Sequence, residues 1–262
     1  MFHGLDNQFL YSAYKITATF ADDIGNVKSG TGTCFFVKNK SGNFCLITNR
    51  HVVDLSYKKD DASLSKYSIR EIKISGKSAR IGDNFPESDL SFEVDPNIEV
   101  STDYQNDVAC ITELSLLSGV NVRLDYWIPY SFLASESDFQ LNLTVCDFLA
   151  FPGFPEWHDK RGNRPILRTG TICSDPRFDY SYGESVGGSC VAYEAFSYSG
   201  SSGSPIFAVQ KGPEPGVGIS FPGFRRLLLI GINAGHLKAS NNSHSGISYF
   251  YKSVAILDII DA

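Results

Sequence analysis

The stretch "FSYSGSSGSPIF", residues 196–207, decides how the rest of the chain is interpreted. Its richness in glycine and serine is typical of a flexible linker. An apolar run follows directly after Pro205, however, and such a run would anchor the stretch in a core, which a linker does not need. Glycines flank Ser202 closely and permit a tight turn that aims backbone N–H groups at one point. The alternative to a linker is therefore a constrained turn that presents one of its five serines: Ser197, Ser199, Ser201, Ser202 or Ser204.

The composition is that of a folded protein rich in strands. The 262 residues are 42% hydrophobic, 20% charged and 13% aromatic, with 23 glycines. Many aromatic residues and glycines, without a long segment of helix formers, favour strands and turns. A chain of this length can bury roughly 70–75% of its unfolded surface, so its core needs neither a metal nor a disulfide.

The charge pattern excludes several classes of partner. The net charge is -6 and the sequence pI is about 5.4, without the basic cluster that a nucleic-acid surface would need. The apolar runs are far shorter than the roughly 18 residues of a membrane span. The first twenty residues lack the pattern of a signal peptide. We therefore expect a cytoplasmic protein with no nucleic-acid or membrane partner.

The cysteines stand singly inside apolar runs, at positions 34, 45, 110, 146, 173 and 190. Without a C-x-x-C motif or a Cys/His cluster they predict no metal site, and we expect no cofactor. Buried single cysteines behave as small hydrophobes, and we expect reduced thiols. Cys34 and Cys45 could face each other across a hairpin, so whether they pair stays open.

Short apolar or alternating runs, separated by turn residues, predict many strands. Strand–helix alternation is missing, so a parallel α/β sheet is disfavoured, and antiparallel barrels or sandwiches are favoured. One helix is expected at 253–262, and the stretch 48–56 should end in a short helical turn. Residues 55–106 should hold two or three strands, and 116–142 should connect two halves. The other predicted strands are 14–22, 30–39, 44–53, 71–75, 107–114, 143–153, 166–174, 189–198, 204–210, 226–235 and 246–253.

Two further stretches supply the residues that a nucleophilic serine needs as partners. His51 follows an apolar strand in "FCLITNRHVV", and Asp107 opens another in "NDVACI". Each residue alone has an ordinary structural explanation. A carboxylate entering an apolar strand needs a partner, however, and a histidine N–H would supply one. The order His51, Asp107, Ser202 is one of the known arrangements of the Ser-His-Asp mechanism.

Through these motifs the chain resembles the chymotrypsin-like (trypsin-fold) serine peptidases, and most closely their bacterial, Deg-like branch. The stretches "GTGTCFFV…CLITNRHVV", "NDVACI" and "GSSGSP" carry the resemblance, which extends over about residues 14–260. It implies an all-β fold of two antiparallel Greek-key β-barrels packed side by side, with a short C-terminal helix. Residues 1–125 would form the barrel with His51 and Asp107, and residues 126–262 the barrel with Ser202.

The resemblance also implies roles in a serine endopeptidase that acts on a protein or peptide substrate. Ser202 would attack the scissile carbonyl, and His51 would take the serine proton and pass it to the leaving amine. Asp107 would hold the imidazole and stabilise its charged form. The backbone N–H groups of Gly200 and Ser202 would form the oxyanion hole.

Departures from the family pattern concern specificity and control. Phe196 stands where trypsin has the aspartate that selects Arg or Lys, so we expect non-tryptic specificity. Members selective for Glu or Gln have a histidine at the position of Asn233. We expect the substrate to contact Phe196 and the strand residues Asn233, Ala234, Gly235 and His236, while His3, His158 and His244 receive no role.

Control is expected to lie outside the chain. Ser201 replaces the aspartate that activates digestive relatives, so the sequence predicts no zymogen switch, and a separate regulatory protein is a possible partner. Two alternative functions are compatible with a single serine motif. One is a catalytically silent, peptidase-like binding or regulatory module. The other, an α/β-hydrolase esterase, is disfavoured because its nucleophile motif needs a glycine at Ser204 and the reverse order of the three residues.

Overall fold

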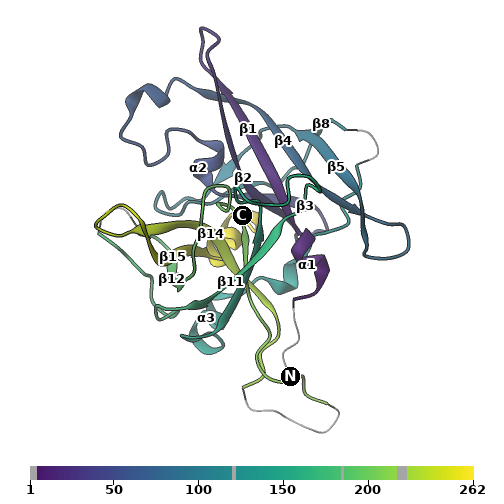
Figure 1. The fold of residues 1–262 in the computed structure, drawn as a ribbon, viewed down its shortest axis with the longest axis vertical. Helices are drawn as coiled ribbons and strands as arrows, with labels where there is room; N and C mark the ends of the chain where they lie inside the picture. The colour runs from purple at the N-terminus through teal and green to yellow at the C-terminus, as the bar shows by residue number, and fades with distance from the viewer. Residues whose placement is uncertain (1–4, 120–121, 184–185, 217–222) are drawn as a thin grey trace.

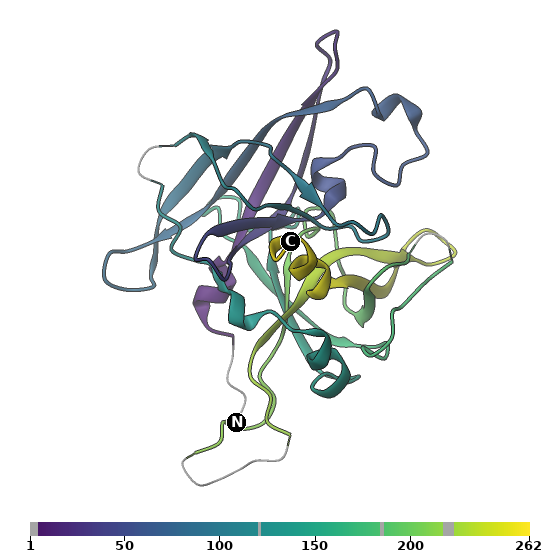
Figure 2. The same ribbon diagram turned by 180° about the vertical axis from the view of Figure 1, so that it is seen from behind.

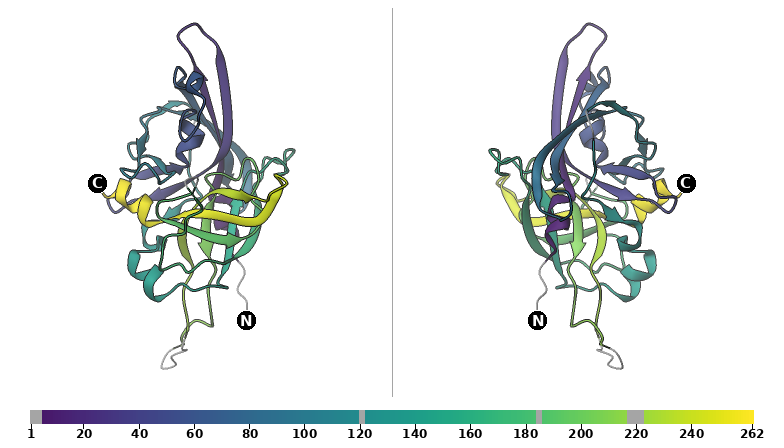
Figure 3. Two further views of the ribbon diagram at one scale, coloured as in Figure 1. Left: turned by 90° about the vertical axis from the view of Figure 1, so that its left-hand side faces the viewer. Right: turned by 90° about the vertical axis from the view of Figure 1, so that its right-hand side faces the viewer.

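The computed structural model describes residues 5–119, 122–183, 186–216 and 223–262, which form two β-rich lobes side by side (Figures 1 and 3). The first lobe is an open, curled sheet with the strand order β6-β7-β3-β2-β1-β4-β5-β8, and β9 also pairs with β2. Its strands are β1 (Ala13–Ala21), β2 (Val27–Lys38), β3 (Phe44–Thr48), β4 (Ser68–Ala79), β5 (Pro86–Val94), β6 (Glu99–Val100), β7 (Ala109–Ile111), β8 (Leu116–Ser118) and β9 (Ile128–Pro129).

The second lobe is a closed barrel in which all six strands pair in the cyclic order β10-β11-β12-β15-β14-β13. Neighbouring strands are antiparallel throughout. The strands are β10 (Phe148–Gly153), β11 (Ile166–Ile172), β12 (Cys190–Glu194), β13 (Pro205–Ala208), β14 (Leu228–Lys238) and β15 (His244–Lys252). Its interior is filled by apolar and aromatic side chains, including Phe151, Tyr193 and Phe250.

The predicted two-lobed β fold with a C-terminal helix is confirmed, and each of the eleven predicted runs contains a strand. The expectation of two barrels needs one correction, because only the second lobe closes on itself. The two terminal strands of the first sheet, β6 and β8, do not pair with each other within the described residues. The division at residue 125 stays a prediction, although β9 lies beyond it and pairs in parallel with β2 of the first lobe.

Four short α-helices and two 3-10 helices complete the described structure. The predicted helical turn after β3 is α2 (Arg50–Val53), and the predicted C-terminal helix is α4 (Val254–Ile260). Helices α1 (Asn7–Tyr11) and α3 (Glu136–Leu141) were not expected, since they are too short for an apolar period to mark them. The 3-10 helices are η1 (Ala62–Leu64) and η2 (Tyr130–Phe132). No helix among the described residues is long and apolar enough to cross a membrane.

A shared hydrophobic core holds the lobes together. It combines Phe35 and Ile47 of the first lobe with Phe207 and Ile232 of the second. Helix α4 lies in the centre of the view in Figure 2 and at the outer edge of the molecule in Figure 3, and it contributes Ile256 to the same core. Because apolar side chains of both lobes are removed from water together, the two sheets are held as one packed unit.

The strand register resolves the question of Cys34 and Cys45. Cys34 lies opposite Tyr14 of β1, and Cys45 lies opposite Val37 of β2. Residues three apart on a strand point to opposite faces, so Cys34 and Val37 do, and Cys45 shares the face of Val37. The two thiols therefore lie on opposite sides of the sheet, which a disulfide cannot span. All six cysteines are free.

Tyr14 provides a test of how the segment before β9 is held against β1 in the first lobe. Its side chain is fully buried, and its hydroxyl donates to the carbonyl of Tyr126 at 2.8 Å. Burial raises the pKa of this phenol well above its usual value, so it stays a donor. Tyr14→Phe leaves that carbonyl unsatisfied and should lower the free energy of unfolding by about 1–3 kcal/mol. Urea denaturation measures the change.

The neighbouring Tyr11 supplies the matched control. Its ring contacts Tyr126, but no hydrogen bond of its hydroxyl is found among the described residues. Tyr11→Phe should change the stability by less than about 0.5 kcal/mol. Equal losses in both variants would contradict a specific role for the Tyr14 hydrogen bond.

Candidate active site

His51 and Asp107 form a close pair at the edge of the first lobe. The Asp107 carboxylate accepts twice from His51: from the ring Nδ1 at 2.5 Å and from the backbone N–H at 2.9 Å. The Asp107 side chain is 10% exposed and the His51 side chain 32%. The carboxylate therefore fixes both the orientation of the ring and its tautomer, with the proton on Nδ1 and a lone pair left on Nε2.

The local sequence explains why these two residues meet. Asn49 is the N-cap residue of α2, and its side-chain amide donates to the carbonyl of Asp107 at 2.7 Å. This bond ties the start of α2 to the start of β7, so that His51 lies directly beside the Asp107 carboxylate. The stretch "TNRH" was singled out for its histidine, but the role of Asn49 appears only when the two strand ends lie together.

Buried tyrosines surround the Asp107 carboxylate on its other side. Burial, reinforced by the negative charge of Asp107, raises the pKa of Tyr57 and of Tyr249. Both phenols therefore stay neutral. Lys58 lies nearby and donates to the carbonyl of Gln105 at 2.8 Å, while burial lowers the pKa of its ammonium group. The Asp107 side chain is thus only 10% exposed, whereas the His51 side chain stays 32% exposed.

The turn at residues 200–204 is constrained rather than flexible. Gly200 and Gly203 have φ angles of +89° and +88°, a region that favours glycine. The turn is fastened to β2 of the first lobe by Thr33, whose N–H donates to the carbonyl of Ser202 at 2.8 Å. The Thr33 hydroxyl donates to the carbonyl of Gly200 at 2.8 Å and accepts from the N–H of Phe154 at 3.0 Å.

Asn233 supports the same turn from behind. Its side chain is fully buried and donates to the carbonyl of Ser201 at 2.7 Å and to the hydroxyl of Ser197 at 2.9 Å. Its amide oxygen accepts from the hydroxyl of Tyr193 at 2.7 Å. Asn233 thus lies under the turn and binds the turn's own groups. Its expected contact with substrate stays a prediction.

Ser202 is partly exposed at the tip of this turn. Its hydroxyl donates to the carbonyl of Ala234 at 3.3 Å, and no hydrogen bond to His51 is found among the described residues. A Cβ atom added at Gly32 would touch both Val52, the neighbour of His51, and the carbonyl of Ser202. The serine therefore comes close to the His51–Asp107 pair across the junction of the lobes.

The expected oxyanion donors are available. Across the described residues, the backbone N–H groups of Gly200 and Ser202 have no acceptor. A turn that leaves two such donors unsatisfied in a rigid frame can stabilise an oxyanion, because the donors need no reorganisation when charge develops.

The expected substrate-contacting residues form one wall beside the turn. Phe196 is 50% exposed, and Ala234, Gly235 and His236 continue β14 past Asn233. Sequence reasoning missed His244, to which no role was given. Its ring stacks on His236 with a centroid distance of 4.2 Å. His158 is buried against the carbonyl of Pro155, and His3 lies outside the described residues.

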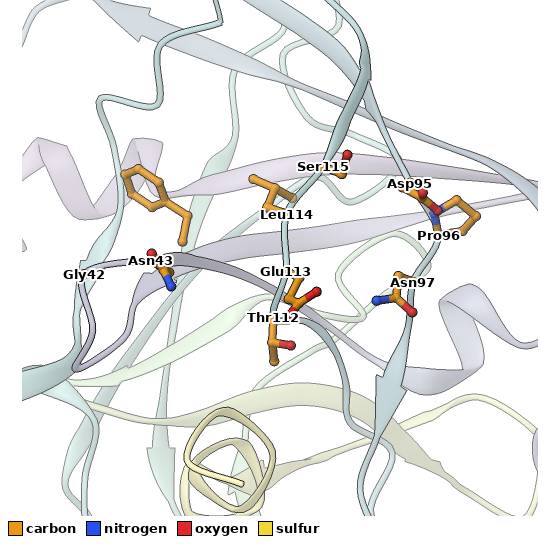
Figure 4. A pocket seen from close by; sticks show the side chains of 10 residues that line it. Gly42, Asn43, Asp95, Pro96, Asn97, Thr112, Glu113, Leu114 and Ser115 are labelled. Atoms are coloured by element: carbon orange, nitrogen blue, oxygen red, sulfur yellow. The ribbon is translucent and has the colours of Figure 1, made fainter.

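Of two hollows on the described surface, one borders the site and the other lies away from it. One of about 210 Å³ lies directly beside the turn and is lined by Ser199, Gly200, Phe154 and Lys15 among others. A larger, polar groove of about 800 Å³ lies on the first lobe (Figure 4). It is lined by residues such as Asp95, Asn97 and Glu113, and it shares no residue with the site.

The fold and the site define a class of protein: a two-lobed β protein in which a constrained serine turn lies at the junction of the lobes, near a hydrogen-bonded His–Asp pair. Family comparison agrees, because the model of the trypsin-like peptidase domain matches residues 32–213. The chain therefore belongs to the trypsin-like peptidase domain family. It is a serine protease of trypsin-like fold.

Solved structures agree in fold at low sequence identity. A thermostable serine protease, AL20, from an extremophilic microorganism is 13% identical, with a TM-score of 0.52 and 97% of each chain covered. The protease Anisep from Arthrobacter nicotinovorans is 14% identical, with a TM-score of 0.51, and 92% of this chain and 90% of that one are covered. A search of curated protein sequences found no match.

Gly203→Ala tests the fit of the turn against β2. A Cβ atom at Gly203 would overlap the carbonyl oxygen of Thr33 and lie 2.8 Å from the hydroxyl oxygen of Thr48. We expect a loss of more than about 3 kcal/mol in the free energy of unfolding, because a backbone clash adds to the cost of positive φ. Chemical denaturation followed by tryptophan fluorescence measures it.

Gly25→Ala is the control. Gly25 has nearly the same φ angle, +87°, but a Cβ atom there would meet nothing within 4 Å. The free energy of unfolding of this variant should therefore fall by only about 1–2 kcal/mol, which is the cost of a left-handed backbone for alanine. A loss at Gly203 no larger than that at Gly25 would contradict the close packing of the turn on β2.

Proposed function

We propose that this protein is a serine endopeptidase in which Ser202, His51 and Asp107 act as a catalytic triad. The hydrogen-bonded His51–Asp107 pair carries the proposal most directly, since a carboxylate that fixes the tautomer of a partly exposed histidine leaves Nε2 ready to take a proton. The turn that presents Ser202 lies against the same junction.

The proposed reaction proceeds through an acyl-enzyme. The Ser202 hydroxyl turns from the carbonyl of Ala234 toward His51, gives its proton to Nε2 and attacks the scissile carbonyl carbon. The N–H groups of Gly200 and Ser202 hold the resulting oxyanion. Collapse of the tetrahedral intermediate breaks the C–N bond, and His51 passes the proton to the leaving amine. Water then attacks the ester by the same route, which releases the acid and restores Ser202.

Asp107 does not change its protonation in this scheme. It stabilises the imidazolium that forms on His51 in both halves of the reaction, and the buried shell around it strengthens that interaction. The half-exposed, uncharged ring of Phe196 supports the expectation of non-tryptic specificity, because it offers no negative charge for an ion pair with a basic side chain.

The second candidate function is a silent, peptidase-like binding module. The hydrogen bond from Ser202 to Ala234, rather than to His51, is the observation that favours it. In a peptidase the Ser202 hydroxyl must be able to break its hydrogen bond to Ala234 easily, whereas in a silent module it need not. Reaction of Ser202 with an active-site probe separates the two.

Labelling by a fluorophosphonate is the corresponding prediction. The wild-type protein should react covalently at a single serine, and Ser202→Ala should abolish the reaction. Ser201→Ala is the matched control, because the Ser201 hydroxyl is buried and has no partner, so its removal breaks no hydrogen bond. Peptide mass mapping locates the adduct. Labelling that survives in Ser202→Ala, or a wild type that is never labelled, would contradict the triad.

We also propose that the activity is controlled by a separate protein. The support is Ser201, whose buried, unpaired hydroxyl stands where digestive relatives have an activating aspartate. The Deg-like branch and the cytoplasmic location stay predictions beside this one.

The purified protein should therefore hydrolyse casein slowly, at no more than a few per cent of the rate of an equal concentration of trypsin. Release of acid-soluble peptide measures this rate. High activity of the isolated chain would contradict external control and would leave the triad proposal intact.

A further inference from the structure

A cluster of rings stands beside the serine turn, and we call it the ring cluster: Phe196, Tyr198, His236 and His244. The two imidazoles stack with an interplanar angle of 15°. The ring of Phe196 lies 4.8 Å from that of His244 and stacks on Tyr198 at 6.2 Å, centroid to centroid. The cluster joins β14 and β15 to the segment that leads into the nucleophile turn.

A chain of hydrogen bonds connects the ring cluster to the turn that carries Ser202. The N–H of Ser197 donates to Nε2 of His244 at 3.1 Å. The Ser197 hydroxyl in turn accepts from Asn233, which also holds the carbonyl of Ser201. A substrate side chain that lies against the rings would therefore contact groups that are hydrogen-bonded to the turn of the serine that would attack the following peptide bond.

An uncompensated cation lies behind the rings. Arg168 of β11 places its guanidinium 4.7 Å from the centroid of Tyr198 and 5.8 Å from that of Phe151. Its Nη1 is buried and has no hydrogen-bond partner within the described residues. None of the ion pairs in the described part of the chain joins Arg168 to a carboxylate. A half-buried cation without a counter-charge is unfavourable unless a ligand supplies one.

The two histidines differ in what they can bind. His244 faces a backbone N–H at each ring nitrogen, from Ser197 at 3.1 Å and from Gly246 at 2.9 Å. If the ring carried protons on both nitrogens, each ring N–H would face a backbone N–H donor. His244 is therefore held neutral and in a fixed orientation. Burial, followed by the neighbouring His236, lowers its pKa, and Arg168 acts in the same direction.

His236, in contrast, has free ring nitrogens. They have no hydrogen-bond partner among the described residues, and the ring is only partly buried. Burial and, after it, Lys238 lower its pKa. Among the described residues, its ring stacks on His244 of β15, and Lys238 of its own strand acts on its pKa. The Tyr249 hydroxyl lies beside the adjacent Gly235, and Arg168 of β11 acts on His244. These groups are neutral or positive.

We propose that the ring cluster and Arg168 form a subsite for an acidic side chain, glutamate or aspartate, on the acyl side of the cleaved bond. His236 donates to the carboxylate, Arg168 supplies the opposite charge from behind Tyr198, and the rings of Phe196 and His244 contact the methylene groups. A glutamine at the same place would leave Arg168 uncompensated, and a lysine would add a like charge. The cleavage preference rests on the proposed peptidase function, whereas the binding preference does not.

The test compares two fluorogenic peptides that differ only in glutamate or glutamine before the scissile bond. The ratio of kcat/KM, glutamate over glutamine, should be about tenfold or more, as expected for a charge-assisted hydrogen bond. Arg168→Met and His236→Ala should each reduce the ratio toward one, and Arg168→Lys should retain part of it. Arg177→Met is the control, because Arg177 is an exposed arginine already paired with Asp175.

The pH dependence of the same ratio separates binding from a structural role. Bound carboxylate raises the pKa of His236 from its lowered value, whereas the peptide glutamate stays ionised above roughly pH 5. The ratio should therefore increase as the pH falls from 8 to 6, and His236→Ala should remove this increase. A ratio that is independent of pH and of His236 would overturn the subsite.

Binding to Ser202→Ala makes the two proposals distinguishable. This variant should bind the glutamate peptide about tenfold more tightly than the glutamine peptide in a calorimetric titration, whether or not the wild type cleaves. Tighter binding of glutamate without any cleavage or probe labelling would refute the peptidase proposal and support the subsite. Cleavage or binding that is indifferent to the charge, or that favours lysine, would refute the subsite and leave the peptidase.

Discussion

The hydrogen bonds of Thr33 fix the position of the second lobe relative to the first. Its N–H and hydroxyl donate to the carbonyls of Ser202 and Gly200, and its own carbonyl accepts from the hydroxyl of Thr48 at 2.9 Å. The same hydroxyl accepts from Phe154 of the second lobe. One residue of β2 therefore fixes the turn that carries Ser202, the proposed nucleophile, relative to the strand that leads to His51. The shared apolar core joins the lobes, but these directional bonds set their alignment.

This alignment explains why the turn is built from glycine at two places. At Gly203 a side chain would occupy the space of the Thr33 carbonyl, and at Gly200 it would overlap the carbonyl of Phe154. The bonds that Thr33 and Asn233 make to the turn join uncharged groups and do not depend directly on pH. These bonds can therefore hold the free N–H groups of Gly200 and Ser202 in place while protons move beside them.

Electrostatics differ on the two sides of Ser202. On one side the Asp107 carboxylate is enclosed with His51 by neutral tyrosines, which keeps its influence on the imidazole strong. On the other side the uncharged ring cluster lies over Arg168, whose charge has no partner in the described chain. The Asp107 carboxylate is paired with His51 within the protein. The Arg168 charge, in contrast, would be paired only when a ligand brings a negative charge.

The sequence alone determined most of the strands, the C-terminal helix and the candidates His51, Asp107 and Ser202, because alternation and turn residues are local and the motifs are short. It missed β8 and β9, which lie in the stretch 116–142 that was expected only to connect two halves. It could not determine that the first sheet stays open, that Thr33 and Asn49 fasten the site, or that His244 and Arg168 meet beside Phe196. Those facts depend on contacts between residues far apart in the chain. Strand order, register and the packing of one lobe on the other decide such contacts, and none of these leaves a mark in the spacing of single residues.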